Sequence, residues 1–424
     1  MAPPVRRRAA AGIRGADVIR VLFLIEDTPY QFDNRVRREV RTLRGAGAAV
    51  VVIAPRHPGE PWHEEADGIH LYRYATPMPS TGAWSYAVEY AVSLAAHAAL
   101  TAWVAWRHGI DVIHAANPPD LLWLVALPYR LLGGVRFVFD HHDLVPELYE
   151  ERFARSDRWT LAALRRLERA SLALADHVVA TNESVRAVAL NRGGRRAEDV
   201  TVVRNGPDAR DFAAVPPDPA IRALGRVVVG YLGQMNPQDG VERFLEMARL
   251  IRHEHGRGDI GFVMVGSGAS FTALRQRRDA LGLQDAVVMT GCVPWHDVLA
   301  TLGATDICVQ PDPRGPLNDR ATMNKLMEYL ALGRAVVAYD LPETRVSGGE
   351  AVAYAAGDRV EDLAAAVLAL ADDPRRLAEL QRAGRARVRD VLGWQHQAPH
   401  LLAVYEKLFP GRLRLAAAEH RQAG

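Results

Sequence analysis

Two segments in the second half of this 424-residue chain combine polar residues with a predicted helix start, which is a combination that binds anions. The loop GQMNPQDG runs from Gly233 to Gly240 and leads from a strand-like run into a helical pattern. In TMNKLMEYLALG, Asn324 and Lys325 open the helical pattern that also carries Glu328. Helix-start amides together with a lysine ammonium predict a diphosphate clamp. The alternative is a surface Lys and Glu at helical spacing.

A third segment, FVFDHHDLVPELYE, places ionisable side chains at the end of a predicted strand in the first half of the chain. His142 with Asp143 is the main candidate pair, and His141 is the alternate. An imidazole here could donate a hydrogen bond or orient a hydroxyl group. Its alternative roles are to cap the following helix or to be satisfied in the core.

Both halves alternate β-branched runs with helical patterns, which predicts two α/β domains, each with a parallel sheet between helices. Ligands of such sheets bind at the carboxyl ends of the strands. Other first-half residues expected in loops or helix starts at that edge are Asn34, Arg35, Asn117, Asp120 and Glu183.

The proline-rich stretch before Val227 lacks periodicity and predicts a domain boundary. A final helical pattern follows Gly393. The expected organisation is a disordered tail at 1–16, a first domain at 17–208, a linker at 209–225, a second domain at 226–394, a helix at 395–411 and a tail at 412–424.

Composition excludes several classes of protein. Lys plus Arg total 52 against 50 for Asp plus Glu, so the net charge of +2 gives no basic field for nucleic acid. The two cysteines, Cys292 and Cys308, make no disulfide framework, and we expect buried, reduced thiols and a cytoplasmic location. Residues 1–16 have arginines but no apolar core, so they are no secretory signal; weak contact with anionic lipid is left open.

The most apolar segment, Tyr90 to Trp106, is too short and too interrupted by polar residues for a membrane span, so we expect a buried or interfacial helix. A dinucleotide enzyme is also disfavoured. The first strand is followed by EDTPYQFDN, which has no glycine, and Phe271 takes the third glycine position after Gly266 and Gly268. No Walker lysine motif, HExxH or paired CxxC occurs.

The order of NPPD, FDHHDLVPELYE, NPQDG, NDRATMNK and ALGRAVVAYDLPE along the chain resembles family 4 of the glycosyltransferases, in a subgroup associated with bacterial cell-surface polysaccharide. The resemblance implies the GT-B fold: two Rossmann-like parallel-sheet domains facing a cleft, with the final helix crossing back to the first. It implies an acceptor-binding first domain, a nucleotide-sugar-binding second domain, retention of anomeric configuration, and no bound metal or other cofactor.

The resemblance also assigns roles to residues of the second domain. Glu328 matches the family's contact to the ribose, and Val293 and Pro294 lie where the backbone contacts the base. Gly266 and Gly268 would let the nucleotide approach closely, unless they only make a tight turn. The full donor set that we expect is Gly233, Gln234, Asn236, Gln238, Asp239, Gly240, Gly266, Gly268, Val293, Pro294, Asn318, Asp319, Arg320, Asn324, Lys325, Leu326 and Glu328.

Three positions depart from the family pattern. Gln234 replaces an arginine, Asp239 replaces a lysine, and Arg320 falls where a glutamate should grip the sugar. Asp239 must then point away from the diphosphate, for example by capping the helix, or contact something else. Lys325 is the expected substitute cation, helped by Arg35. Asn318, Asp319 or Arg320 would hold the sugar.

We therefore expect a hexosyltransferase that uses a nucleoside diphosphate sugar, with UDP favoured and GDP open. Its acceptor would be a saccharide, a lipid-linked saccharide or a small molecule, and a peripheral contact at the inner face of the membrane is left open. Two alternatives remain: a UDP-sugar 2-epimerase on the same fold, and a non-catalytic nucleotide-sugar-binding scaffold.

Overall fold

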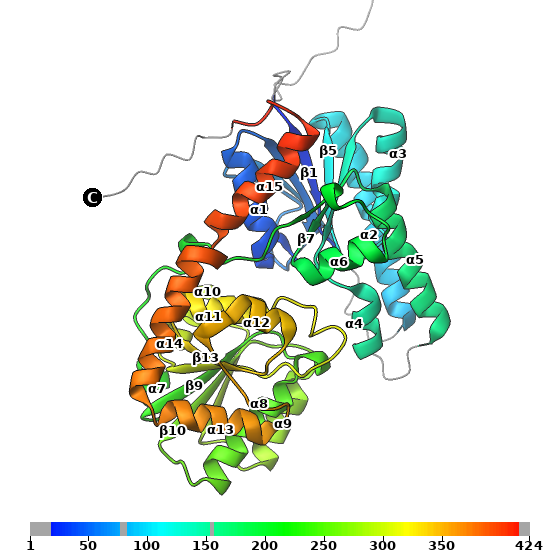
Figure 1. Ribbon diagram of the computed structural model, residues 1–424. Helices are drawn as coiled ribbons and strands as arrows, with labels where there is room; N and C mark the ends of the chain where they lie inside the picture. Colours follow the sequence, from blue (N-terminus) through cyan, green and yellow to red (C-terminus); the bar gives the residue numbers. More distant parts are fainter. Residues whose placement is uncertain (1–17, 77–82, 153–156, 415–424) are drawn as a thin grey trace, which may run out of the picture. The chain divides into compact units, whose positions relative to one another are not determined.

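The computed structural model describes residues 18–76, 83–152 and 157–414 (Figure 1). The expected disordered tail at 1–16 lies outside the described residues, as does 415–424. Two compact units are present: unit 1 comprises Met1–Pro146, Asp157–Val203 and Ala398–Gly424, and unit 2 comprises Glu147–Ser156 and Arg204–Gln397.

Unit 1 is built on an eight-stranded sheet with the order β3-β4-β2-β1-β5-β6-β7-β8. Its strands are parallel except for β3, which pairs antiparallel with β4 at the edge. The central strands are buried along almost their whole length, as β-branched runs covered on both faces should be. The bounds are β1 Arg20–Leu24, β2 Ala49–Pro55, β3 His63–Ala66, β4 Ile69–Tyr74, β5 Val112–Ala116, β6 Arg136–His141, β7 His177–Ala180 and β8 Val200–Val202.

Helices cover both faces of the unit 1 sheet. Parallel crossovers are right-handed, so α1, which leads from β1 to β2, covers one face, and α2, α3, α5 and α6, which lead the other way, cover the opposite face. The bounds are α1 Asn34–Gly45, α2 Ala83–Arg107, α3 Trp123–Gly133, α4 Val145–Arg152, α5 Arg158–Leu174 and α6 Glu183–Asn191, with short turns η1 Tyr30–Phe32 and η2 Ala197–Asp199.

Unit 2 has a six-stranded, all-parallel sheet with the order β11-β10-β9-β12-β13-β14. The direction of winding reverses between β9 and β12, which is where ligands bind in open sheets of this kind. The strands are β9 Val227–Leu232, β10 Ile260–Val265, β11 Val287–Gly291, β12 Ile307–Gln310, β13 Ala335–Ala338 and β14 Val352–Tyr354.

The helices of unit 2 again cover two faces. By the same crossover rule, α8 and α9 lie on one face and α10, α11 and α12 on the other; α13 packs on α8, and α14 on α11. The bounds are α7 Pro219–Arg222, α8 Val241–Arg249, α9 Phe271–Ala280, α10 Trp295–Gly303, α11 Asn324–Ala331, α12 Pro342–Gly348, α13 Val360–Ala371, α14 Pro374–Arg387 and α15 Trp394–Leu408. Short 3-10 turns are η3 Ala209–Asp211, η4 Pro237–Asp239 and η6 Gly349–Ala351, and π-helical segments are η5 Leu250–Glu254 and η7 Val388–Leu392.

The described chain departs from the expected organisation in four places. Residues 147–152, most of α4, belong to unit 2 although they precede the expected boundary, and the expected linker contains α7. By contrast, the last helix, α15, contributes to both units, as expected for a final helix that crosses back to the first domain. The expected tail begins later than residue 412, since the Arg414 amide donates to the Ala46 carbonyl at 2.9 Å. Cys308 is buried as expected, but Cys292 is exposed.

Candidate functional site

The loops after β9 and β10 pack backbone against backbone at the carboxyl edge of the unit 2 sheet. A Cβ at Gly266 would lie 2.0 Å from the Gly233 carbonyl oxygen, and one at Gly268 would lie 2.7 Å from the Met235 amide nitrogen. Gly233 and Gly266 also have φ values of 150° and 122°, which favour glycine. Loop packing alone therefore requires both Gly266 and Gly268, and a nucleotide contact stays a prediction.

The polar side chains of the Gly233–Gly240 loop are used within the loops. The Asp239 carboxylate accepts from the Asn236 amide at 2.9 Å, so it closes the short turn η4. The Asn236 side chain donates to Gln234 Oε1 at 2.8 Å and accepts from the Ala269 amide at 3.2 Å. Asp239 thus caps a turn, which is one of the two roles left open for it by the sequence.

Lys325 is the cation around which this edge of unit 2 is organised. Its Nζ donates to both carboxylate oxygens of Asp312, at 2.9 and 3.2 Å, and lies 5.2 Å from the centre of the Tyr231 ring. Its side chain is 10% exposed and that of Asp312 is fully buried. Burial disfavours the ammonium, but Asp312, Tyr231 and Asp239 outweigh it and raise the pKa of Lys325. The lysine is therefore charged at physiological pH.

Lys325 is the second residue of α11, whose first turn has no side-chain cap. Met323 occupies the N-cap position, where Ser, Asp or Asn would normally accept from an amide. Asn324 is exposed, Leu326 is buried in the core, and Glu328 is half-buried. The start of α11 therefore combines amides without a side-chain cap and a charged lysine, as a binding site for an anion requires.

Asn318 does not fit the predicted role of a sugar contact. It is 3% exposed, and its amide group donates to the carbonyls of Gln238 at 3.1 Å and Pro313 at 2.9 Å. The side chain ties the loop after β12 to the loop after β9.

The charged residues that follow Asn318 form ion pairs within unit 2. Arg320 lies 3.5 Å from the Glu147 carboxylate and donates to the Pro316 carbonyl at 3.2 Å. Asp319 lies 3.5 Å from Arg314. Contacts of Asp319 and Arg320 with a sugar stay predictions.

Val293 and Pro294 follow β11, the edge strand next to β10. Val293 packs against a core cluster, and Pro294 is exposed just before α10. Their proposed backbone contact with a base stays a prediction.

In unit 1, Arg35 forms a buried ion-pair network at the carboxyl end of β6. Its guanidinium donates to both oxygens of Asp140, at 3.0 and 2.7 Å, to the Val203 carbonyl at 2.6 Å, and lies 3.2 Å from Glu39. Arg35 is 4% exposed. Its burial and its ion pairs within unit 1 disfavour the predicted contact with a diphosphate, which stays a prediction.

His142 joins the same network through its Nε2, which lies 2.6 Å from Asp140 Oδ2. Burial disfavours the imidazolium, but Asp140 outweighs it and raises the pKa of His142 to about 9. At neutral pH the ring is thus an imidazolium whose Nε2–H donates to the carboxylate. The side chain remains 16% exposed.

The carboxylates Glu39 and Asp140 and His114 have ligand atoms within 4.8 Å of one another. Such a group could hold a metal ion, but the Arg35 guanidinium already bonds to both carboxylates. Burial and Asp140 raise the pKa of Glu39. His114 accepts from or donates to the Tyr405 hydroxyl of α15 at 2.8 Å. We interpret the group as a charge network that fixes β5, β6 and α15.

Asn117 positions the segment that carries His142 and Asp143. Its Oδ1 accepts from the amides of both residues, at 2.6 and 3.2 Å, and its Nδ2 donates to the Asp143 carbonyl at 2.7 Å and to Asp120 at 2.9 Å. Burial raises the pKa of Asp120 to about 7. Asn117 and Asp120 are thus buried supports, which corrects their predicted role as cleft residues, whereas Asp143 is exposed.

The remaining first-half candidates separate clearly by burial. His141 is fully buried, 3.5 Å from Glu168, so the alternate candidate is a core residue. Glu183 begins α6, and its side chain is 65% exposed and pairs with Arg186 at 3.4 Å. Asn34 is half-buried at the first position of α1. Of the two histidines, only His142 reaches the surface.

Two glycosyltransferase families match the chain. The family described as "Glycosyl transferase 4-like domain" matches residues 33–206, and "Glycosyl transferases group 1" matches residues 226–373. An alpha-maltose-1-phosphate synthase of Mycolicibacterium smegmatis is 30% identical over 300 residues, which cover 66% of this chain and 74% of that protein. The chain belongs to the GT-B glycosyltransferases.

Solved structures agree with the fold of this glycosyltransferase. A sucrose-phosphate synthase from Thermosynechococcus elongatus gives a TM-score of 0.76 at 20% identity, covering 92% of this chain and 99% of that one. The Anabaena protein Alr3699/HepE, solved in complex with UDP-glucose, gives a TM-score of 0.65 at 16% identity. The match covers 92% of this chain and 99% of the Anabaena protein. The predicted fold class is confirmed.

Sequence reasoning missed the partners that organise both sites. Asp312 lies in QPDP directly after β12, at the carboxyl edge of the sheet, and that position was the available signal. Glu39 lies four residues after Arg35 on α1, so helical spacing could have indicated this pair. Asp140 gives no such signal, because it meets Arg35 across 105 residues of sequence.

Proposed function

We propose that this glycosyltransferase belongs to family 4 and transfers a hexosyl group from a UDP-sugar to an acceptor hydroxyl, with retention of configuration, in the synthesis of polysaccharide or another glycoconjugate. The observation that carries the proposal is the start of α11, where Lys325 and amides without a side-chain cap meet. UDP is preferred because the structurally similar Anabaena protein was solved with UDP-glucose.

The main chemical task in this proposal is to stabilise the leaving diphosphate. The Lys325 ammonium and the first amides of α11 would bond to its oxygens as negative charge develops there. Asp312 holds the ammonium at 2.9 Å and so fixes its position before the donor arrives. The positive charge comes from the protein, and we propose that turnover needs no metal ion or other cofactor.

Retention follows if the acceptor attacks from the face that the diphosphate leaves, so that no enzyme nucleophile is required. The C–O bond to the diphosphate breaks, the bond to the acceptor oxygen forms, and the hydroxyl proton passes to the leaving diphosphate oxygen. His142 cannot take that proton as a base near pH 7, because its pKa of about 9 keeps it protonated. Its role in this proposal is to donate a hydrogen bond to a sugar or acceptor oxygen.

The acceptor would bind in unit 1 and is a saccharide, a lipid-linked saccharide or a small molecule. We also propose a cytoplasmic location. If the protein were instead a 2-epimerase, UDP-N-acetylglucosamine without an acceptor would be converted into its epimer; we expect none.

The test compares the two lysines of the chain, Lys325 and Lys407. Lys407 is 46% exposed on α15 and serves as the matched control. UDP, GDP, dTDP and ADP are screened by thermal shift, since a ligand of the native state raises its melting temperature. We expect UDP to give the largest shift, Lys325→Met to abolish it and Lys407→Met to leave it unchanged. A larger shift with another nucleotide would refute the UDP assignment, and an intact shift in Lys325→Met would refute the site.

A further inference from the structure

Helix α2 of unit 1 buries three polar side chains and leaves several large apolar ones exposed, which is unusual for a helix that faces water. Its inward side chains Ser93, His97 and Thr101 are each at most 1% exposed. The His97 ring bonds to the Ile25 carbonyl at 3.1 Å, which fixes this side to the sheet. The outward side chains include Val88, Val92, Trp103 and Trp106, at 40%, 42%, 42% and 75% exposure.

The outward side of α2 lacks the charged residues that would make it compatible with water. No Asp, Glu, Lys or Arg occurs between Glu89 and Arg107. By length and composition Val88–Arg107 could cross a membrane, and only 22% of its most apolar 18-residue stretch is buried. Yet α2 packs on β2, β4 and α3, so it is part of the fold of unit 1. Contact of this exposed apolar side with another apolar surface would remove its side chains from water.

The helix that packs beside α2 also exposes apolar side chains. In Figure 1, α3 lies next to α5, and α3 packs against both α2 and α5. On α3, Leu131 is 68% and Leu132 is 90% exposed. Two leucines and two tryptophans on adjacent helices exceed the scattered apolar residues of an ordinary surface.

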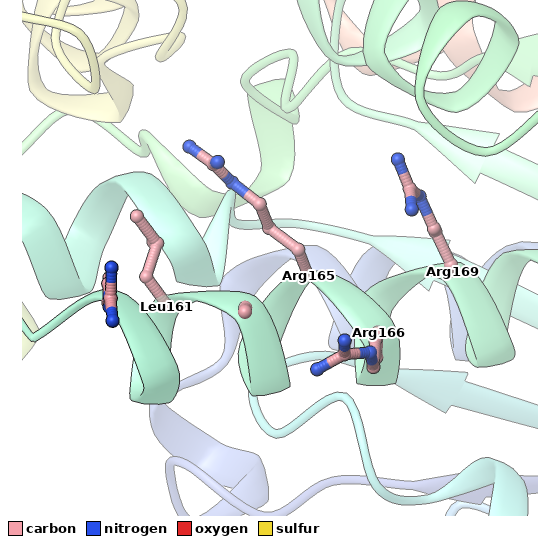
Figure 2. A pocket seen from close by; sticks show the side chains of 6 residues that line it. Leu161, Arg165, Arg166 and Arg169 are labelled. Atoms are coloured by element: carbon pink, nitrogen blue, oxygen red, sulfur yellow. The ribbon is translucent and has the colours of Figure 1, made fainter.

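Helix α5, which packs against α3, carries a row of positive charges. Figure 2 shows Arg165 and Arg169 projecting from one side of the helix, next to a hollow that Arg158, Arg166 and Leu161 also line. All four arginines are exposed. No acidic residue lies among residues 158–167, and Glu168, which follows, is buried. The arginines span about 16 Å of the helix at about 1.5 Å per residue.

We propose that α2, α3 and α5 form a docking surface for an anionic lipid bilayer. Tryptophan prefers the interface between headgroups and acyl chains, and leucine the acyl chains. Arginine binds phosphate with two parallel hydrogen bonds, and basic residues near a membrane are attracted by anionic headgroups. A symmetric contact between two copies would instead bring an arginine-rich surface onto itself. Charge complementarity thus favours the bilayer.

The test is flotation of the full chain with vesicles of equimolar phosphatidylglycerol and phosphatidylcholine, compared with phosphatidylcholine alone, at low and high salt. We expect binding to the anionic vesicles that high salt weakens. Arg166→Ala should lower the partition coefficient about fivefold, and Trp106→Ser about tenfold. The matched controls are Arg275→Ala, on α9 of unit 2, and Trp62→Ser, 56% exposed, which should bind like the unchanged protein.

Two results would overturn the proposal. One is no vesicle binding, or equal binding to both vesicle types that neither Trp106→Ser nor Arg166→Ala changes. The other is a dimer by light scattering that Trp106→Ser converts into monomers, which would assign the surface to a second copy. Because neither donor nor acceptor is added, the outcome is independent of the proposed glycosyl transfer.

Discussion

The ion pair between Lys325 and Asp312 allows a structural role for the lysine to be separated from a role in donor binding. Lys325→Met leaves the Asp312 carboxylate, fully buried, without its partner at 2.9 Å. Breaking a buried pair costs about 3–5 kcal/mol, and since the ammonium is 10% exposed we expect about 3. For a unit of this size that lowers the melting temperature by roughly 6–12 °C. Loss of one charge-assisted bond to a diphosphate costs about 2–3 kcal/mol, or roughly 30- to 150-fold in Kd for UDP.

The double variant Lys325→Met with Asp312→Asn decides between the two roles. It removes both charges, so most of the melting temperature should return, while UDP affinity stays low. Asp312→Asn alone should lose stability, because it leaves the ammonium unpaired, yet keep or strengthen UDP binding. Melting temperatures and calorimetric titrations with UDP measure both quantities. If the double variant recovered UDP binding along with stability, Lys325 would act only through folding, and the reasoning would be refuted.

Three further results are expected. The pKa of His142 is raised to about 9 because the interaction with Asp140 outweighs burial. The protonated ring therefore contributes about 3 kcal/mol to stability, fully below about pH 6.5 and not at all once the pH has risen through 9. His142→Gln should flatten this part of the curve of melting temperature against pH, and an unchanged slope would contradict the assignment. Gly266→Ala should weaken UDP binding at least tenfold, because the added Cβ would lie 2.0 Å from a carbonyl oxygen. The control Gly303→Ala, whose Cβ would meet no atom nearer than 3.8 Å, should bind UDP normally. Equal affinities of the two variants would show that the Gly266 loop does not shape the site. Arg35→Met should cost about 3–5 kcal/mol in unfolding by denaturant, because Asp140 is left buried without its main cation, and a loss under 1 kcal/mol would contradict the network.

The sequence predicted the elements well where periodicity and loop chemistry agreed. The alternation of strands and helices was enough for the fold, and the helix start at Lys325 lies where the pattern placed it. The hairpin of β3 and β4 was missed, although Asp67-Gly68 at its tip is a strong turn signal, with both residues at positive φ. The apolar segment that became α2 was expected to be buried or interfacial, but its amphipathic side could not be oriented without the sheet that it covers.

Individual site residues were harder to predict because their partners are distant in sequence. The position of Arg35 at a helix start indicated a side chain that could bind an anion. Only the fold shows that its guanidinium already pairs with Asp140 and Glu39. Likewise, the sequence ranked His142 above His141 without showing which of the two is buried. The alternation of side chains along β6 and its end sends His141 into the core and His142 toward the surface. Ion pairs of this kind depend on strand order, which one sequence does not specify.

The most direct test of the central claim is a crystal structure of the protein with UDP bound. The account predicts diphosphate oxygens within hydrogen-bonding distance of the first amides of α11 and of Lys325 Nζ. A diphosphate held elsewhere on unit 2, with Lys325 still paired only with Asp312, would contradict it.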